Sequence, residues 1–570
     1  MWEGYVDYRY KPAFRGRHGG MRAALFVLVV EVLENLAFLA NASNLVLYFS
    51  KHMNLSPSKS AIDVTNFMGT AFLLALVGGF LSDAFFTSYY IYVMSAGIEF
   101  LGLIMLTFQA RSPYLKPASC DISKTAKCEE VHGGKAAMLF IGLYLVAIGV
   151  GVIKGSLPAL GAEQFDESTP KGRKERSTFF NYFVFCLSCG GLIAVTFVIW
   201  IEDNIGWQWG LGISTISIVL SIIILLAGSS FYRCKIPKGS PLTTMAKVLL
   251  AAALNVSTTK SQKNCVMTNL TQNPYPLIPA YVEEHEMKTD GPETSTLSKN
   301  LNCLNRAAEN KPAYKSLECS VQEVEDVKIM LQLLPIFACS IILNCCLAQL
   351  STFSIQQATT MNTNLGSFAV PPGSLPIFPI VFMMIMAPLY DHIIIPYSRK
   401  WTKSETGISH LQRVGIGLFF SIIAMAIAGL VEVKRKKVVK THGLSNGSLP
   451  ISFLWIAFQY LFLGSADLFV LAGLMEFAFT EAPVRMRSLA TSFSWVSLAM
   501  GYYLSGIIVS LVNRITGSGR HHHSWLSGKT LNQYHLDRFY WLLCAFSILN
   551  FVNYLFWANR YKYKSISANI

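Results

Sequence analysis

Long apolar runs separated by short polar segments recur along the whole chain. A helix needs roughly 20 mostly apolar residues to cross a bilayer, and runs of this kind follow one another from residue 22 to residue 558. The alternation typical of a membrane β-barrel is absent, so the pattern indicates helices. We predict about twelve spans, at residues 22–49, 64–84, 89–110, 136–161, 178–201, 208–230, 328–358, 375–397, 413–432, 450–478, 488–513 and 538–558.

One long polar segment divides these predicted spans into two sets of six. Residues 232–326 are rich in Asn, Thr, Ser, Lys and Glu, a composition typical of a flexible segment, although residues 241–255 have the pattern of a short amphipathic helix. We therefore expect one six-helix bundle over residues 1–231, a cytosolic linker over 232–326 and a second bundle over 327–570. Two such halves are typical of transporters that rock around a site near the middle of the membrane.

The composition is typical of a membrane protein, and the positions of its positive charges indicate its orientation in the bilayer. Of the 570 residues, 52% are hydrophobic and 14% are charged, whereas a soluble protein carries about a quarter charged residues. The net charge is +14, and lysines and arginines gather in the short loops after the even-numbered spans, which indicates orientation in the bilayer. We expect both termini in the cytosol, no cleaved signal peptide and no nucleic-acid partner.

Two charges of opposite sign lie inside predicted spans. Lys154 lies in the apolar run 136–161 and Glu476 in the apolar run 449–479. A charge at this depth is costly and usually marks the path of a substrate, proton or ion. We predict that Lys154 and Glu476 form a gating salt bridge between the two halves that is made and broken during transport. The alternative is a static structural ion pair.

Carboxylates in the first span are candidates for proton binding. Glu31 and Glu34 are three residues apart, so they share one face of a helix. Two carboxylates this close in a medium of low polarity resist simultaneous ionisation, which favours proton uptake by the pair. Glu476 is a further candidate for proton coupling, because its protonation would release the predicted pair with Lys154. The alternative for Glu31 is a solvated position near the interface. Glu99 in the third span is either a residue that supports the site from behind or a polar residue near the end of its span.

The remaining candidate chemistry is sparse. Cys120 and Cys128 lie in a loop that we place outside the cell, where a disulfide can form, and Asn446 begins a glycosylation sequon on the same side. The predicted spans hold no His/Cys cluster that would bind a metal, and no nucleophile elbow is evident. We therefore expect no metal or other cofactor, and a transporter is favoured over an enzyme.

Three longer stretches surround the charged residues and carry a resemblance to a known family. They are residues 149–167 (GVGVIKGSLPALGAEQFDE), 177–190 (STFFNYFVFCLSCG) and 469–488 (FVLAGLMEFAFTEAPVRMRS). They resemble motifs of the plant nitrate transporter/peptide transporter family, proton-coupled oligopeptide transporters of the major facilitator superfamily. The resemblance covers essentially the whole chain, and the family's fourth-span lysine and tenth-span glutamate fall on Lys154 and Glu476. It implies an all-α fold of twelve transmembrane helices in two six-helix bundles, and alternating access in the plasma membrane.

Two positions depart from what the resemblance implies. The family usually has a basic residue directly after its first-span glutamates, and here that position is Asn35. The glutamates lose a fixed counter-charge, so the strength of proton coupling stays open. The family's best known nitrate transporter has a histidine where Leu347 stands here. Leucine cannot donate a hydrogen bond to an oxyanion, which disfavours nitrate and suits a larger, partly apolar substrate.

Residues 34–48 and 63–69 resemble most closely a subfamily described as importing abscisic acid, and a related member is described as a low-affinity nitrate carrier. Abscisic acid is a carboxylic acid on an apolar ring, so it needs a cationic anchor and an apolar wall. Lys154 is the expected anchor. The other expected substrate-binding positions are Asn35, Phe38, Asn41, Phe183, Leu347, Glu476 and Trp495.

The sequence therefore predicts a proton-coupled importer of an organic anion, most closely matched by abscisic acid. Gibberellin has the same combination of a carboxylate and an apolar skeleton, so it stays an alternative within the same class, as does nitrate. A membrane receptor or sensor that binds a hormone without net transport is the alternative of another class.

Overall fold

The computed structural model describes most of the chain. The residues outside its description are 3, 56, 118–129, 238, 255–300, 309–316, 351, 366–367, 371–374, 403–406, 443–448, 518–524, 527–530 and 564–570. The predicted disulfide between Cys120 and Cys128 and the predicted glycosylation of Asn446 lie outside the described residues. The chain forms two compact units, one of residues Met1–Gly239, Pro335–Glu481 and Arg485–Ile570, and one of Ser240–Leu334 with Ala482–Val484.

Among the described residues, twelve helices are long and apolar enough to cross a membrane, and the predicted fold class is confirmed. The spans of the first half are formed by α1 (Met21–His52), α2 (Pro57–Leu73) with α3 (Ala75–Ala84), α4 (Ser88–Arg111), α5 (Gly134–Ala162), α6 (Pro170–Ile193) continued by η2 (Ala194–Val198) and α7 (Ile199–Asn204), and α8 (Trp207–Gly228). Those of the second half are formed by α10 (Val321–Ala348) with α11 (Phe353–Thr359), α12 (Ile377–Leu389) continued by η6 (Tyr390–Ile394) and α13 (Ile395–Thr402), α14 (His410–His442), α15 (Leu454–Glu481), α16 (Arg487–Gly517) and α17 (Leu536–Arg560).

Short strands and 3₁₀ turns lie in the segments that precede or connect the long helices. Strand β1 (Tyr5–Val6) pairs antiparallel with β2 (Cys234–Lys235), and β4 (Asn364–Leu365) pairs antiparallel with β5 (Phe368–Ala369). Strand β3 (Met361–Asn362) pairs parallel with β6 (Leu449–Ser452). The 3₁₀ turns are η1 (Pro113–Leu115), η3 (Asn302–Ala308), η7 (Val484–Met486) and η8 (Leu531–Gln533).

The smaller unit has a core of its own. A helix at Pro241–Leu254, close to the predicted amphipathic helix at 241–255, contributes Val248 and Ala251 to this core. They pack with Leu304 of η3 and with Val324 and Val327 from the beginning of α10.

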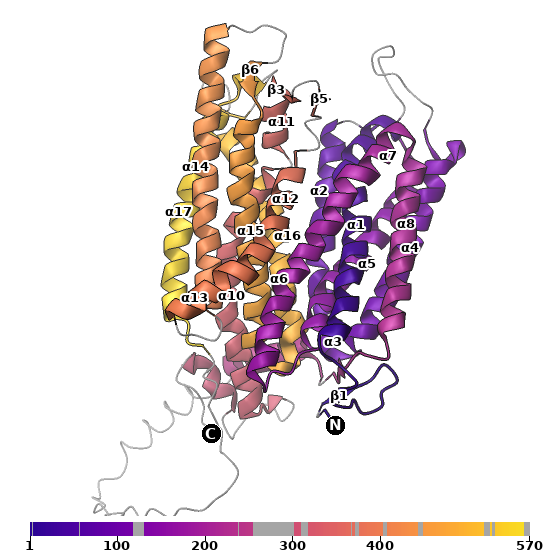
Figure 1. Cartoon of the computed structure of the whole chain (residues 1–570), viewed down its shortest axis with the longest axis vertical. Coiled ribbons are helices and arrows are strands. Elements are labelled where there is room, and N and C mark those ends of the chain that lie inside the picture. The colour runs from indigo at the N-terminus through magenta and orange to yellow at the C-terminus, as the bar shows by residue number, and fades with distance from the viewer. Residues whose placement is uncertain are drawn as a thin grey trace, which may run out of the picture. The chain divides into compact units, whose positions relative to one another are not determined.

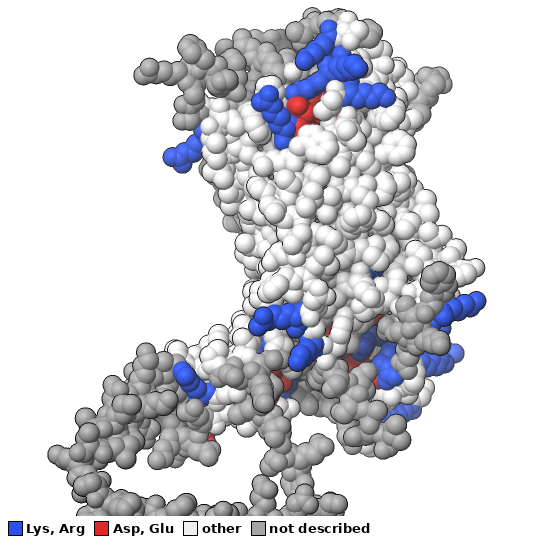
Figure 2. All heavy atoms as spheres, turned by 90° about the vertical axis from the view of Figure 1, so that its left-hand side faces the viewer, with Lys and Arg blue, Asp and Glu red and all other residues white. Residues whose placement is uncertain are grey.

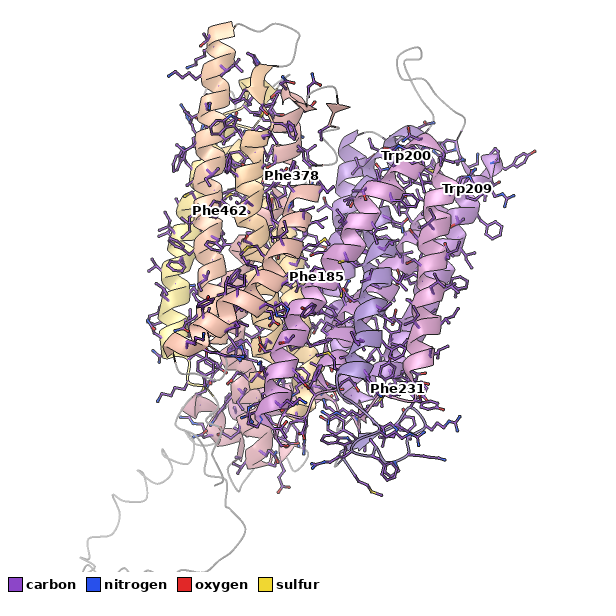
Figure 3. The ribbon with its side chains drawn as sticks, in the orientation of Figure 1. Phe185, Trp200, Trp209, Phe231, Phe378 and Phe462 are labelled. Carbon is purple, nitrogen blue, oxygen red and sulfur yellow. The ribbon has the colours of Figure 1, made fainter. Side chains whose placement is uncertain are left out.

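Figure 1 shows that α1 begins and α17 ends at the same end of the bundle, which we call the terminal end, and the opposite end is the far end. Figure 2 shows lysines and arginines at both ends of one face and an uncharged band between them. Figure 3 places the aromatic side chains of Trp200 and Trp209 at the far end and that of Phe231 at the terminal end, and all three are exposed. Exposed aromatic residues at both ends of an apolar band are typical of a protein that spans a bilayer.

Two glycines allow helix backbones to approach closely inside the large unit. A Cβ at Gly155 of α5 would lie 2.0 Å from the carbonyl oxygen of Ala75 in α3. A Cβ at Gly79 of α3 would lie 2.5 Å from the carbonyl oxygen of Ser488 in α16. Neither position accepts a larger residue without movement of backbone. Helix α3 therefore packs closely against both α5 of the first half and α16 of the second half.

A buried ion pair involves one member of the group of lysines and arginines at residues 434–440, which lies in the last part of α14. The guanidinium of Arg435 donates to both carboxylate oxygens of Glu432, at 2.7 and 2.6 Å, and to Oδ1 of Asn532 at 2.6 Å. Gln357 of α11 donates a further hydrogen bond to Glu432 at 2.9 Å. Arg435 and Glu432 are both fully buried. These hydrogen bonds connect α14 to α11 and to Asn532 of η8 at the far end.

Replacing Arg435 with leucine should strongly destabilise the protein, because the Glu432 carboxylate would stay buried without its counter-charge. Loss of one partner from a buried pair costs about 3–5 kcal/mol. We expect a clearly lower melting temperature of the purified protein, and a smaller loss when both residues become leucine. The control is Lys437→Ala, an exposed cation on the same helix. Equal melting temperatures for Arg435→Leu and wild type would contradict the structural role of the pair.

Candidate functional site

Lys154 lies at the centre of a buried charged cluster. Its Nζ donates to Oε1 of Glu31 at 2.9 Å and to Oε2 of Glu34 at 2.5 Å. Both carboxylates are fully buried, and Lys154 is 1% exposed. Oε2 of Glu31 and Oε1 of Glu34 have no hydrogen-bond partner among the described residues. One cation is thus shared between two carboxylates that each retain a free oxygen.

Helix geometry explains how the sequence builds this cluster. The two glutamates lie one turn apart on the same face of α1, and Lys154 lies eight residues before the end of α5. Asn35, which follows the pair, donates from Nδ2 to the carbonyl oxygen of Leu187 in α6 at 2.6 Å and accepts from Lys154 at 3.3 Å. Asparagine therefore contributes an acceptor at the position where the family usually has a cation.

An aromatic side chain from the second half covers the cation. Nζ of Lys154 lies 5.3 Å from the centroid of the Trp495 ring of α16, within the range of a cation–π interaction. The Trp495 ring stacks on Phe72, with centroids 5.7 Å apart and planes at 6°, and Phe72 meets Phe38 edge to face. Three residues of the predicted site therefore lie in one continuous group of contacting side chains, namely Lys154, Trp495 and Phe38.

The structure does not bring Lys154 and Glu476 together, so the predicted gating pair is not formed in this conformation. Oε2 of Glu476 lies 3.5 Å from Arg413 and 3.7 Å from Nδ1 of His410, both at the beginning of α14. Lys154 is instead held by carboxylates of its own half. The sequence contains three acidic residues that could pair with this lysine. In the structure, the packing of α5 against α1 brings Lys154 to the two that lie on α1.

Ion pairs do connect the two halves, and they lie at the terminal end. The guanidinium of Arg487, the first residue of α16, donates to both carboxylate oxygens of Glu167, one of them at 2.7 Å. Arg176 of α6 lies 3.4 Å from the same carboxylate and donates to Thr480 of α15 at 3.1 Å. Burial opposes ionisation of Glu167, but the two guanidinium groups hold its pKa below the usual value. The contact therefore persists as an ion pair at neutral pH.

A second contact at the terminal end uses the beginning of α16. Oδ2 of Asp83, near the end of α3, accepts from the backbone N–H of Leu489 at 2.8 Å, where a negative charge is favoured by the helix dipole. Lys235 of β2 holds the other oxygen of Asp83 at 3.0 Å and lies 3.9 Å from Glu163. Burial raises the pKa of Glu163 to about 7, and Lys235 opposes that shift. A carboxyl that titrates near neutral pH thus lies beside this contact.

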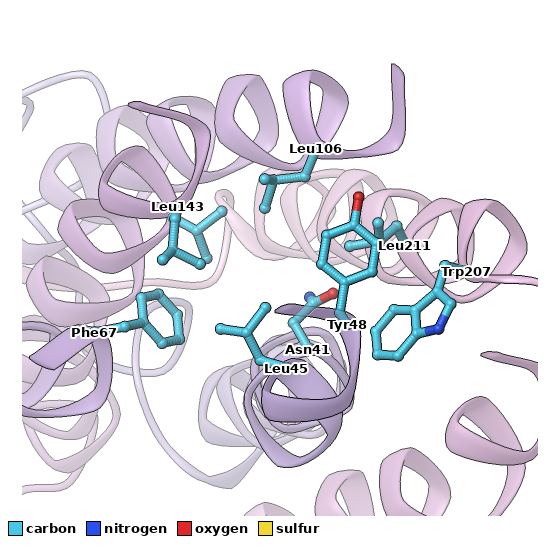
Figure 4. A pocket seen from close by; sticks show the side chains of 9 residues that line it. Asn41, Leu45, Tyr48, Phe67, Leu106, Leu143, Trp207 and Leu211 are labelled. Atoms are coloured by element: carbon cyan, nitrogen blue, oxygen red, sulfur yellow. The ribbon is translucent and has the colours of Figure 1, made fainter. Parts of the chain in front are cut away.

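The other predicted substrate residues have surroundings of a different kind. Asn41 lines a small pocket inside the first half with Leu45, Tyr48, Phe67, Leu106, Leu143, Val146, Trp207 and Leu211 (Figure 4). Phe183 is buried in α6 and its ring lies 5.9 Å from that of Phe179. Leu347 is half-buried in α10. Within the described residues, no group of three or more His, Cys, Asp or Glu could hold a metal ion.

The residues that pair with Glu476 and those that connect the two halves could not be predicted from the sequence. In the sequence, Arg487 and Arg176 belong to the loop cations that indicate orientation in the bilayer, and nothing distinguishes His410, Arg413 or Asp83 from other polar residues near span ends. The available signal was the presence of opposite charges at the ends of spans in different halves. That signal indicates candidates, but it does not indicate which charges meet.

The fold and the buried site define a membrane transporter, and comparison with known proteins identifies its family. The model of the POT family matches residues 89–526. The chain is 64% identical over 578 residues to Protein NRT1/PTR FAMILY 4.6 of Arabidopsis thaliana, covering 100% of this chain and 98% of that protein. It is 62% identical over 569 residues to Protein NRT1/PTR FAMILY 4.5 of the same plant, again covering 100% and 98%.

Solved structures agree on the fold. The POT family transporter PepTSo has a TM-score of 0.63 at 16% identity, covering 96% of this chain and 99% of its own. A POT family transporter in complex with 5-aminolevulinic acid has a TM-score of 0.59 at 13% identity, with coverages of 96% and 98%. This chain belongs to the POT family and, within it, to the NRT1/PTR group. It is a multi-pass membrane transporter and not an enzyme, as the sequence predicted.

Breaking the pair between Arg487 and Glu167 should open the terminal end. We expect Arg487→Ala to increase, by several-fold, the labelling of a cysteine introduced at the buried Ser488 by a water-soluble maleimide. Site-resolved mass spectrometry separates this position from the native cysteines. Arg487→Lys, which keeps a cation beside Glu167, should retain part of the protection.

The matched control for this experiment is Lys171→Ala, which removes an exposed pair with Glu175 at 3.8 Å on α6. Exposed pairs of this kind contribute about 1 kcal/mol or less, so labelling should not change. Equal labelling in Arg487→Ala and Lys171→Ala would show that the ion pair does not keep this end closed.

Proposed function

We propose that this chain is a proton-coupled importer of an organic anion, with abscisic acid as its substrate. In this proposal it works in the plasma membrane, with the terminal end in the cytosol and the far end outside. The observation that carries the proposal is the buried ammonium of Lys154 shared between Glu31 and Glu34.

The charge balance of this cluster couples an anion to protons. A substrate carboxylate that binds Lys154 must displace one or both glutamates from its ammonium group. An ion that is buried without a counter-charge costs several kcal/mol, so a displaced glutamate is stable only in its protonated form. Substrate binding then favours proton binding, and release of the substrate on the cytosolic side allows Lys154 to re-form its pairs.

The surroundings of Lys154 suit an anion with an apolar body. Trp495 and Phe72 offer stacked aromatic faces beside the cation, and Phe38 extends the same surface. The indole N–H of Trp495 is buried and has no hydrogen-bond partner among the described residues, so it can donate to a polar group of the substrate. A small inorganic oxyanion such as nitrate would make little apolar contact with these aromatic side chains.

The contacts at the terminal end support an alternating-access cycle that starts from outside. Arg487 and Leu489, which bind the first half, lie on the same helix as Trp495. Movement of α16 would therefore change both the terminal-end contacts and the cover over Lys154. We propose that α16 carries this coupling, in place of a direct pair between Lys154 and Glu476.

Lys154→Ala should lower saturable, acid-stimulated uptake of labelled abscisic acid at least tenfold. A charge-assisted hydrogen bond contributes about 1.5–3 kcal/mol, and 1.4 kcal/mol corresponds to a factor of about ten. Uptake is measured in cells expressing the chain at acid and neutral external pH, after subtraction of passive entry, with surface protein quantified. Lys437→Ala is the control for loss of a cation away from the site.

Uptake by Lys154→Ala at the wild-type rate would reject the anchoring role of this lysine. Labelled gibberellin and nitrate in the same assay distinguish the alternative substrates, because gibberellin also combines a carboxylate with an apolar skeleton. A hormone sensor without transport would bind abscisic acid and show no counterflow of labelled ligand.

A further inference from the structure

Glu99 is a buried carboxyl that the proposed mechanism does not use. It lies in the middle of α4 and is 0% exposed. Neither of its carboxylate oxygens has a hydrogen-bond partner among the described residues. A carboxyl group in this position requires a physical explanation, because buried polar atoms are generally paired.

Helix α5 is shaped to admit this side chain. A Cβ at Gly149 would lie 2.4 Å from the Cβ of Glu99, so only glycine fits opposite it. Gly149 is five residues before Lys154, which is about 7.5 Å along the helix axis. The charged groups that act on Glu99 are Glu34 of α1 and Lys154 of α5. Glu99 therefore belongs to the same region of the membrane interior as the Lys154 cluster.

The neighbouring helices offer Glu99 no cation of its own. Helix α8 carries no charged residue, and its Ser221 accepts from the hydroxyl of Tyr92, two turns before Glu99 on α4. Asp83 of α3 is held by Lys235. Lys154 is already bound to Glu31 and Glu34. Because an ionised carboxylate buried without a partner costs several kcal/mol, Glu99 carries a proton in this conformation.

We infer that Glu99 is a third proton-binding group of the transport site, beside Glu31 and Glu34, and that it binds and releases a proton in each transport cycle. The inference rests on the proposed proton coupling. One proton taken by the Glu31–Glu34 pair balances the charge of a monovalent anion. A second proton, bound at a carboxylate oxygen of Glu99 outside and released to water inside, makes the whole step carry one net positive charge.

The experiment measures charge and label together in voltage-clamped cells supplied with labelled abscisic acid at acid external pH. Passive entry of the protonated acid moves no charge, so it does not contribute to the current. We expect wild type to pass about one positive charge per saturably transported molecule. Glu99→Gln, which keeps the shape and the neutral form, should retain labelled uptake and lose at least nine-tenths of the current per molecule.

Two variants make the result specific. Glu99→Asp keeps a carboxyl group and should restore part of the current. Ser95→Ala is the matched control, because it removes another buried polar group of α4 whose hydroxyl bonds only to its own helix at 2.6 and 3.1 Å, and its charge per molecule should equal that of wild type. The same charge per molecule in Glu99→Gln and wild type, or saturable uptake by wild type without current, would overturn the inference.

A second readout separates this inference from the choice of substrate. If no variant transports abscisic acid, the proposed substrate is rejected, and proton binding is measured on the purified protein by infrared difference spectroscopy between acid and alkaline pH. We expect a carboxylic-acid C=O signal that changes with pH in wild type and is lost in Glu99→Gln. Identical difference spectra for the two proteins would overturn the role of Glu99.

Discussion

The structure depends on the way in which one buried ammonium group is divided between two carboxylates. Lys154 contacts Glu31 at 2.9 Å and Glu34 at 2.5 Å in a region without access to solvent. Charges in such a place are stable only while they are paired. An anion that displaces a glutamate from Lys154 therefore supplies the new counter-charge of the lysine, and the displaced glutamate must bind a proton. That requirement is sufficient to link the movement of an anion to the movement of protons.

Helix α16 links this site to the contacts between the halves. Its first residues bind Glu167 and Asp83 at the terminal end, and Trp495, eight residues after Arg487, covers Lys154. Eight helical residues span about 12 Å, so one rigid segment contacts both places. The backbone contact at Gly79 keeps α16 against α3. A rearrangement of this helix can thus expose the site and open one end in a single movement.

The sequence alone was sufficient for the membrane class, the number of spans and the identity of the central charges. Apolar runs of membrane length indicate spans directly, and charges inside them are rare enough to stand out. It was not sufficient for the pairing of those charges. Lys154 had acidic candidates on α1 and α15, and only the packing of α5 against α1 decides between them. Glu99 shows the same difficulty, because the fit against Gly149 depends on two helices whose register the sequence does not give.

Departures from the family pattern acquire a physical meaning only in the structure. Asn35 does not merely remove a charge, since its amide bridges Leu187 of α6 and Lys154 of α5. Without a second cation, the cluster holds more carboxyl groups than it can keep ionised. The site is therefore expected to be protonated readily and to lose its protons when Lys154 regains its partners.

The most direct test of this account is the number of protons that the purified protein takes up when abscisic acid binds. Titration calorimetry in buffers with different heats of ionisation gives this number, since the observed heat then varies with the buffer in proportion to the protons exchanged. The account predicts net proton uptake on binding of the anion near neutral pH, and a clear reduction of that uptake in Glu31→Gln with Glu34→Gln. Binding of the anion with no proton exchange would contradict it, because Lys154 could then leave its carboxylates without their protonation.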